Sequence, residues 1–235
     1  VRTRISVDFF PHVNSEVYLD RIGGTPLLTF SATPHDEVKL LVKRSLDVLV
    51  SSLALLLLSP LLLLIALAVR LSSAGPVIFR QLRCGLNGRR FYVCKFRSMV
   101  ANAEDLKASV AHLNVKQLNF KIPNAPRLTT VGGWLRKFSL DELPQFWNVL
   151  KGDMSLVGPR PALPEEVERY QSWQRRRMRM RPGVTCIWAV EGRDQLDTET
   201  VMRLDMHYID NWSLGLDSQI LLRSIPVVLL GKGAH

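Results

Sequence analysis

A long uncharged segment constrains this chain more than any other feature of its sequence. From Val48 to Val69, 22 consecutive residues carry no charge, and most of them are leucine, alanine or valine. As an α-helix the segment would be about 33 Å long, close to the thickness of the hydrocarbon core of a bilayer. The length therefore predicts a membrane-embedded helix, and a buried helix of a soluble core is the alternative.

The middle of this segment contains a helix-breaking pair, Ser59 and Pro60. Proline removes a backbone hydrogen bond and clashes with the preceding turn, so we expect a kink there. Two topologies are then open: a kinked helix that crosses the bilayer, or a sharply broken one that enters and leaves by the same face. Basic residues at both ends, Lys43 and Arg44 before and Arg70 after, slightly favour the second topology under the positive-inside rule.

The net charge restricts the partners of the chain. Its 31 Lys and Arg residues outnumber 21 Asp and Glu residues, which gives a formal charge of +10 and an isoelectric point near 9.9. This excess indicates an anionic partner, and charge alone leaves open nucleic acid, a phosphorylated substrate or an acidic lipid surface. The three cysteines, Cys84, Cys94 and Cys186, form no CxxC pair, so we expect reduced thiols and neither a disulfide framework nor a zinc site.

The remaining sequence predicts an α+β fold that is mostly helical with a small β-hairpin. Residues 1–37 contain a strand or two and a linker, which we interpret as the remnant of a preceding N-terminal domain. Two alternating segments, Val77–Gln81 and Phe91–Phe96, flank a glycine-containing turn at 85–88 and predict the hairpin. Helical patterns follow at residues 101–118, 133–151, 163–180 and 197–209.

An acidic pair, Asp141 and Glu142, lies in the part of the sequence richest in motifs. Ser139 precedes Glu142 by three residues, which predicts a capping box, and carboxylates in a first helical turn gain about 0.3–1 kcal/mol from the helix dipole. A structural role therefore explains the pair. Adjacent carboxylates can also do chemistry, one attacking phosphorus while the other holds a divalent metal. Arg136 and Lys95 are cations that could accompany them.

A second motif, Gly158-Pro159-Arg160-Pro161, fixes an arginine between two prolines. Proline restricts the backbone, so the Arg160 guanidinium would be presented from a rigid loop, as suits a bidentate phosphate contact. A rigid turn between helices with a solvated arginine is the alternative.

Five arginines occur between positions 175 and 181, interleaved with Trp173, Met178 and Met180. This pattern suits an interfacial amphipathic helix, with apolar side chains in lipid and guanidinium groups on anionic headgroups or on the phosphate of an acceptor. A solvated run of charge without a specific partner is the alternative.

Four segments of the chain, taken in order, are similar to one family. They read KRSLD ahead of the Ser-Pro break, then KFRSM, then LRKFSLDELPQFWNVLKGDMSLVGPRP, then RPGVT. Together they resemble the monotopic polyprenyl-phosphate phosphoglycosyl transferases, the bacterial sugar transferases. The resemblance covers about residues 41–235, and residues 1–37 look like the end of the extra N-terminal domains of larger members.

The resemblance implies a topology. The apolar helix would be re-entrant within residues 38–75, breaking at Ser59 and Pro60 and keeping both flanks on the cytoplasmic side of the bacterial inner membrane. Residues 76–235 would form the cytoplasmic catalytic domain, so membrane lipid is an expected partner. A homodimer is a further expectation, based on the tail at 1–37.

The resemblance also implies a reaction, in which the family transfers a sugar 1-phosphate from a nucleotide diphosphate sugar to polyprenyl phosphate and needs Mg²⁺. It makes Asp141 the nucleophile and Glu142 its metal-binding neighbour. The remaining expected substrate-site residues are the phosphate or nucleotide contacts Lys95, Arg136 and Arg160, and the polar residue Asp205. We expect a UDP-sugar donor, a hexose by analogy with larger members, and undecaprenyl phosphate as acceptor, in the first membrane step of bacterial polysaccharide synthesis.

The chain departs from the family pattern at three positions. The family usually has an acidic residue at the position of Ala125, Gly at that of Cys186 and Gln at that of Ala189. These departures bear on sugar preference and loop stability, and they touch none of the expected site residues.

Two functions of other classes remain as alternatives. A membrane-anchored nucleic-acid binder would use the arginines, but it leaves the acidic pair unexplained and the sequence has no zinc, RNP or helix-turn-helix signature. A non-catalytic scaffold of a polysaccharide-assembly complex would keep the fold without the chemistry, and the intact Asp141, Glu142 and Arg160 argue against it.

Overall fold

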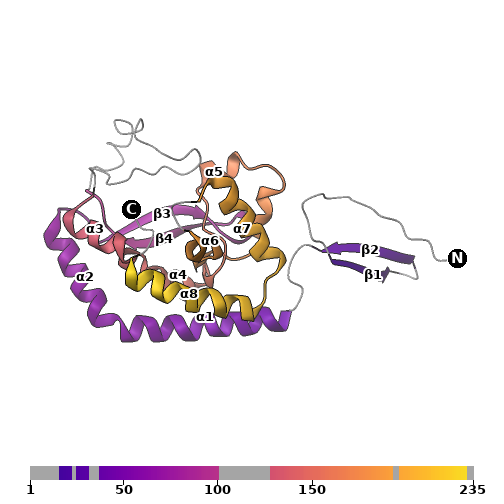
Figure 1. The fold of residues 1–235 in the computed structure, drawn as a ribbon, viewed down its shortest axis with the longest axis horizontal. Helices are drawn as coiled ribbons and strands as arrows, with labels where there is room; N and C mark the ends of the chain where they lie inside the picture. Colours follow the sequence, from indigo (N-terminus) through magenta and orange to yellow (C-terminus); the bar gives the residue numbers. More distant parts are fainter. Residues whose placement is uncertain (1–15, 23–24, 32–36, 101–127, 193–195, 232–235) are drawn as a thin grey trace.

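A computed structural model describes residues 16–22, 25–31, 37–100, 128–192 and 196–231. Within them the chain has the expected α+β fold in which helices dominate (Figure 1). The strands are β1 (Glu16–Ile22), β2 (Thr25–Ser31), β3 (Ile78–Cys84), β4 (Arg90–Phe96), β5 (Ser155–Val157) and β6 (Gly183–Thr185). The α-helices are α1 (Glu37–Leu57), α2 (Ser59–Ser72), α3 (Thr130–Lys137), α4 (Gln145–Lys151), α5 (Pro164–Glu168), α6 (Ile187–Glu191), α7 (Thr198–Asp210) and α8 (Leu214–Leu230). Short 3₁₀ helices are η1 (Leu86–Gly88), η4 (Leu140–Glu142) and η5 (Gln174–Arg179).

The apolar segment forms two helices, α1 and α2, with an angle of 63° between them. Pro60 lies in the first turn of α2, where its missing N–H costs no hydrogen bond, and the Ser59 hydroxyl donates to the Leu56 carbonyl at 2.8 Å. The expected break at Ser59 and Pro60 is confirmed. No single helix in the described ranges is long and apolar enough to cross a bilayer, whereas the bent pair meets that test when its two helices are taken together.

Both ends of the bent pair are fastened to the same globular body. Near the start of α1, Lys43 Nζ donates to Asp217 of α8 at 2.5 Å and to the Val157 carbonyl of β5 at 3.0 Å. Beyond the end of α2, Arg97 donates to the carbonyls of Val69 and Ser73, at 3.2 and 2.6 Å. The bent pair is therefore bonded to the body near both of its ends.

The predicted β-hairpin is present and longer than expected. β3 and β4 pair antiparallel from Ile78 opposite Phe96 to Cys84 opposite Arg90, and η1 forms the turn. A second antiparallel hairpin, β1–β2, lies beyond the N-terminal end of α1, where the sequence predicted a strand or two (Figure 1). β5 and β6 form a short parallel pair inside the body.

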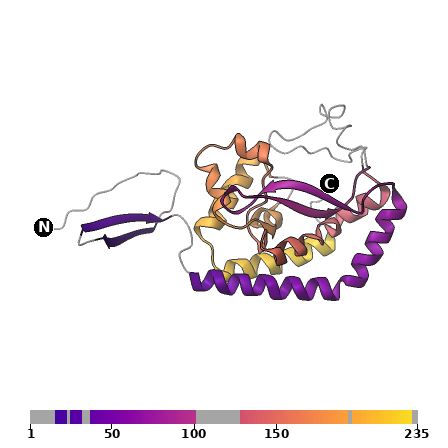
Figure 2. The ribbon, with the colours of Figure 1, turned by 180° about the vertical axis from the view of Figure 1, so that it is seen from behind.

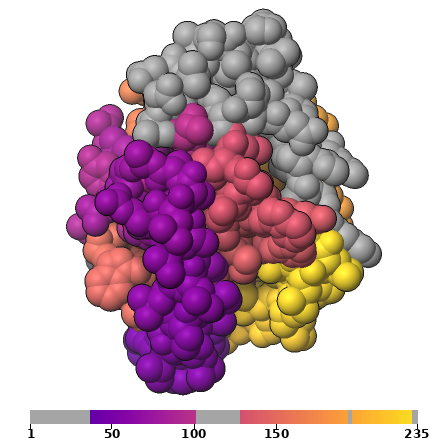
Figure 3. All heavy atoms as spheres, turned by 90° about the vertical axis from the view of Figure 1, so that its left-hand side faces the viewer, coloured from indigo at the N-terminus to yellow at the C-terminus, as the bar shows by residue number. Residues whose placement is uncertain are grey.

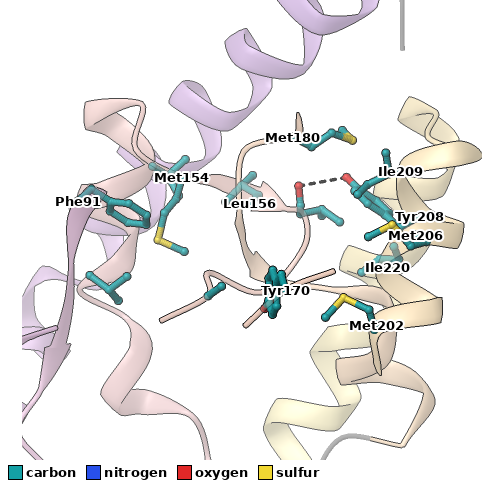
Figure 4. Packing of buried hydrophobic residues seen from close by; sticks show 14 residues of the cluster. Phe91, Met154, Leu156, Tyr170, Met180, Met202, Met206, Tyr208, Ile209 and Ile220 are labelled. Carbon is teal, nitrogen blue, oxygen red and sulfur yellow. Dashed lines mark hydrogen bonds between the residues drawn. The ribbon is translucent and has the colours of Figure 1, made fainter. Parts of the chain in front are cut away.

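The main core packs the inner face of the β3–β4 hairpin against β5, α7 and α8. Phe91 and Met154 lie on one side of this core, and Met202, Met206 and Ile220 lie on the other (Figure 4). The apolar area that these side chains remove from water is the main source of stability for the body.

The buried side chain of Tyr208 makes a hydrogen bond across this core. Tyr208 donates to the Val157 carbonyl at 3.1 Å, the bond drawn as a dashed line in Figure 4, and its hydroxyl lies 2.6 Å from the Asp217 carboxylate. α7 is therefore tied to the same strand, β5, that Lys43 reaches from α1.

Two helical predictions need correction. The pattern at 133–151 is divided into α3, η4 and α4, because Ser139 takes a left-handed conformation and Pro144 interrupts the hydrogen bonding. The pattern at 163–180 is divided into α5 and η5, where the backbone N–H of Gln171 bonds to the side chain of Gln174 instead of continuing a helix. α7 confirms the pattern at 197–209, α8 was not predicted, and the pattern at 101–118 lies outside the described residues.

One face of the molecule is strongly apolar. α1 and α2 bury few side chains, and α8 runs beside α1 in both ribbon views (Figures 1 and 2). In the space-filling view, α1 and α2 lie next to α3, α4 and α8 (Figure 3). Among the exposed large apolar residues of these helices are Val38, Leu41, Leu49, Leu57, Leu63, Leu64, Leu71, Trp134, Trp147, Leu222, Leu229 and Leu230.

We predict that Lys43→Met lowers the free energy of unfolding by about 3–5 kcal/mol, because it leaves the buried Asp217 carboxylate without its cation. The measurement is thermal unfolding of the detergent-solubilised protein. Arg203→Met is the matched control, since it breaks an exposed ion pair with Glu199 and costs less than about 1 kcal/mol. Equal losses in the two variants would contradict the role assigned to Lys43.

Candidate active site

The acidic pair lies on η4, between α3 and α4. The Asp141 side chain is buried and Glu142 is half-buried. The predicted capping box is wrong: Ser139 has φ 54° and makes no capping hydrogen bond, because it ends α3 in the left-handed conformation typical of a helix C-terminus. A backbone hydrogen bond, from Glu142 N–H to the Ser139 carbonyl at 3.1 Å, joins the two residues across this turn.

Lys95 of β4 reaches the acidic pair from the hairpin. Side chains alternate along a strand, so Lys95 shares a face of β4 with the buried Phe91 and Val93. This register directs Lys95 toward the body, where its Nζ donates to Glu142 Oε1 at 2.5 Å. Lys95, one of the two cations that the sequence predicts near the pair, therefore contacts one of its two carboxylates.

The surroundings of Asp141 disfavour its charged form. Burial, together with the negative charge of Glu142, raises the pKa of its carboxyl to about 6. Lys95 and Arg136 oppose it, so Arg136 at the end of α3 is also close enough to act on Asp141. At neutral pH the carboxylate is ionised, poorly solvated and faced by two cations, which suits a nucleophile.

The loop that carries Arg160 is held in place by its backbone. Gly158 N–H donates to the Thr185 carbonyl at 3.1 Å, and Gly183 N–H donates to the Pro159 carbonyl at 3.0 Å. The two chains approach so closely that a Cβ on Gly158 would lie 2.3 Å from the carbonyl oxygen of Arg181. The loop is therefore rigid, as its prolines indicated, and Arg160 Nη1 lies 3.5 Å from Glu166 Oε1.

Arg83 of β3 also contacts the loop that carries Arg160, and the sequence did not predict this contact. It donates to the Pro161 carbonyl at 2.9 Å and, through two nitrogens, to the Gln81 side chain at 2.6 and 3.1 Å. Burial, together with the positive charge of the neighbouring Arg160, lowers the pKa of Arg83 to about 10. Had the predicted strand been extended to residue 84, Arg83 would have been paired with the core residue Phe91, which is the signal that could have identified it.

Asp205 of α7 is completely buried within the body. Its carboxylate forms an ion pair with Arg177 at 2.5 Å, and Arg177 Nη1 donates to the Tyr170 hydroxyl at 2.9 Å. Burial raises the pKa of Asp205 to about 6 against the opposing charges of Arg177 and Arg160. Asp205 thus lies near the Arg160 loop, in the interior of the body.

The arginines at 175–181 do not form one interfacial helix. They lie on η5 and the residues after it, where Arg177 pairs with Asp205 and Arg176 pairs with Asp210, so both point inward. Arg175, Arg179 and Arg181 are exposed. The prediction of an amphipathic lipid-binding helix was wrong for the two buried arginines, because buried carboxylates on α7 draw them into the body.

The acidic pair supplies some, but not all, of the ligands that a metal ion needs. In the described portion of the chain, no cluster of three or more His, Cys, Asp or Glu side chains could hold a metal ion. Mg²⁺, however, is commonly bound by one or two carboxylates together with water and substrate phosphates. Asp141 and Glu142 therefore supply enough protein ligands for a site that a diphosphate substrate would complete.

Comparison with known proteins gives a consistent family assignment. The sequence profile described as "Bacterial sugar transferase" matches residues 38–231. The chain is 42% identical over 221 residues to galactosyl transferase CpsE of Streptococcus agalactiae, covering 93% of this chain and 49% of that protein. It is 42% identical over 200 residues to the exopolysaccharide production protein ExoY of Rhizobium meliloti, covering 83% and 88% respectively.

A third relative has a reaction in its name. The chain is 40% identical over 225 residues to the UDP-glucose:undecaprenyl-phosphate glucose-1-phosphate transferase of Escherichia coli, covering 92% of this chain and 46% of that protein. The chain thus spans about half the length of CpsE and of the Escherichia coli protein, and most of the length of ExoY.

We predict that Asp141→Asn stabilises the metal-free protein at pH 7.5 by about 1–3 kcal/mol. The folded-state pKa of about 6 exceeds the ordinary value of 3.8, so the folded protein loses stability as pH rises through this window. The gain should therefore disappear below about pH 4, where the carboxyl is protonated in both folded and unfolded states. Thermal unfolding in EDTA across this pH range measures it.

The control is the same Asp-to-Asn substitution at Asp197, a carboxyl whose pKa is shifted in the opposite direction. Asp197 caps α7 by accepting from Thr200 N–H at 2.7 Å, and this bond lowers its pKa. Asp197→Asn should therefore show no gain at pH 7.5. A loss of stability in Asp141→Asn at pH 7.5 would contradict the electrostatic account of the acidic pair.

Proposed function

Because the chain belongs to the bacterial sugar transferase family, we propose that it transfers a sugar 1-phosphate from a UDP-sugar to undecaprenyl phosphate. The products are UMP and undecaprenyl-diphosphate-sugar, and the reaction begins the membrane stage of polysaccharide synthesis. The observation that carries the proposal is the buried, ionised Asp141 between Glu142 and the cations Lys95 and Arg136. The name of the Escherichia coli relative describes this class of reaction for a glucose donor.

The reaction proceeds in two displacements. An Asp141 carboxylate oxygen attacks the sugar-bearing phosphorus, a new oxygen–phosphorus bond forms, and the bond to UMP breaks. A phosphate oxygen of undecaprenyl phosphate then attacks the same phosphorus, and Asp141 leaves as a carboxylate. The covalent intermediate avoids direct attack of one anionic substrate on the other and divides a difficult step into two easier ones.

The surrounding cations bind and orient the anionic groups. Lys95 and Arg136 face the acidic pair, where the diphosphate would lie. Arg160, on its rigid loop, is suited to a bidentate contact with a phosphate, and Arg83 supports that loop through the Pro161 carbonyl. Preorganised charge of this kind stabilises a phosphoryl-transfer transition state without reorganisation during the reaction.

Mg²⁺ is the cofactor that we propose for this site. Glu142, with the neighbouring Asp141, would hold it, and the bound ion would neutralise charge on the diphosphate. Because Lys95 already contacts Glu142, this lysine would have to share the carboxylate or turn toward a phosphate when donor binds.

We also propose that the bent pair is re-entrant in the bacterial inner membrane, with the catalytic body on its cytoplasmic face. A crossing helix would place its two ends on opposite sides of the bilayer. In this chain Lys43 at one end and Val69 at the other are both bonded to the same body. The exposed apolar side chains of α1, α2 and α8 would then lie in lipid.

The reaction is tested by UMP release from detergent-solubilised protein with Mg²⁺ and undecaprenyl phosphate, across a panel of UDP-hexoses and UDP-N-acetylhexosamines. We expect release with one donor, and a fall of at least about a thousandfold in Asp141→Asn because its nucleophile is gone. Glu199→Gln, an exposed acid-to-amide change on α7, is the control and should keep full activity. Substantial turnover by Asp141→Asn would exclude the covalent route.

The topology is tested by labelling single cysteines at the two ends of the bent pair with a membrane-impermeant maleimide. Lys39→Cys and Ser72→Cys are introduced separately into a background in which Cys84, Cys94 and Cys186 are alanine. For a re-entrant pair, both positions react only from the cytoplasmic side, in inverted vesicles and not in intact spheroplasts. Reaction of the two positions from opposite sides would show a crossing helix.

A further inference from the structure

A cavity lies apart from the candidate active site, at the N-terminal end of the bent helix pair. Its volume is about 120 Å³, and its wall is formed by α1, η1, β5 and the residues at the end of η5. About 10–15 Å³ of such volume suffices for one water, so the cavity has room for a group of several atoms. Neither step of the proposed reaction uses it.

The wall of the cavity is positively charged. Lys43 and Arg44 line it from α1, and Arg179 and Arg181 line it from the end of η5. Asp47 is the carboxylate that the described wall contains, and its Oδ1 accepts from Leu156 N–H at 3.0 Å. Lys43 is paired with Asp217, and Asp47 offsets one of the three arginines, so the wall keeps an excess of positive charge that favours an anion.

Arg179, the last residue of η5, and Arg181, two residues beyond it, are the arginines available to a ligand. Arg44 donates to the carbonyls of Val149 and Leu150, at 2.6 and 2.8 Å, so its donors are engaged. Arg181 is exposed and donates through Nε to the Gly152 carbonyl at 3.1 Å, which leaves its terminal nitrogens for another acceptor. Arg179 is exposed as well.

The wall also contains a polar atom without a protein partner. Ser155 is completely buried, and within the described structure its hydroxyl makes no hydrogen bond. A buried hydroxyl left unpaired is costly, and a ligand oxygen or water in the cavity would satisfy it. The unpaired Ser155 hydroxyl therefore favours a polar occupant independently of the charges on the wall.

The rest of the wall is apolar and continues toward the lipid-facing side. Leu40, Leu86 and Met180 complete the lining. Val38 and Leu41 on the adjoining turns of α1 are 70% and 67% exposed, and they begin the apolar outer face of the bent pair. A ligand with an anionic head and an apolar tail fits a positively charged cavity that adjoins an exposed apolar helix face.

We infer that this cavity binds the headgroup of an acidic phospholipid. Its phosphate would accept from Arg179 and Arg181, and its acyl chains would lie along the outer face of α1. The inference rests on the proposed membrane placement, since only then does the N-terminal end of α1 lie at the level of the headgroups. It is independent of the proposed reaction.

The test is a titration of the full chain in neutral detergent with dioctanoyl phosphatidylglycerol, followed by the unfolding temperature. We expect saturable stabilisation of the wild type, because a ligand that binds the folded state raises the unfolding temperature. The double variant Arg179→Gln/Arg181→Gln should bind at least about tenfold more weakly. The matched control Arg80→Gln/Arg89→Gln removes two exposed arginines of the β3–β4 hairpin and should bind like the wild type.

Two further ligands identify what is recognised. Dioctanoyl phosphatidylcholine has the same chains without net charge, and inorganic phosphate has the charge without chains. Equal stabilisation by either ligand, or an unchanged affinity in Arg179→Gln/Arg181→Gln, would overturn the inference. If the double variant fails to fold, Arg179→Gln alone serves, because the described contacts of this exposed residue include no hydrogen bond or ion pair. The titration uses no donor or acceptor, so its failure would leave the proposed reaction untouched.

Discussion

The buried contact of Lys43 with Asp217 and with the Val157 carbonyl is the interaction on which the rest of the structure depends. An ammonium group in a mostly apolar helix is costly unless it is paired, so this contact determines which face of α1 meets the body. Tyr208 bonds to the same carbonyl and the same carboxylate, and it thereby joins α7 to the network. Val157 directly precedes the Gly158–Pro161 loop. Lys43 of α1 is therefore bonded to the residue directly before the loop that carries Arg160.

In the candidate active site, the surroundings that destabilise the Asp141 carboxylate would also make it more reactive. Asp141 is buried beside a like charge, and the two opposing cations do not fully offset the loss of hydration. A carboxylate in this state is a better nucleophile than a well-solvated one, and the binding of a cationic metal with the donor would relieve the cost. Stability and reactivity at this position are thus linked through the same charge.

Much of the fold and part of the site follow from local sequence. The Ser59-Pro60 break, the β3–β4 hairpin and the rigid Arg160 loop depend on residues close together in the chain, and the structure has all three. The association of Lys95 and Arg136 with the acidic pair is also present.

What local sequence could not provide are features that depend on distant partners. Ser139 and Glu142 have capping spacing, but the end of α3 and the reach of Lys95 decide their conformations. Arg176 and Arg177 read as a surface pair until α7 supplies Asp210 and Asp205. The role of Arg83 depends on a carbonyl 78 residues away. The bend at Leu58 has a mechanical consequence on the proposed placement: the pair occupies the cytoplasmic leaflet alone, so it expands that leaflet and favours convex curvature toward the cytoplasm.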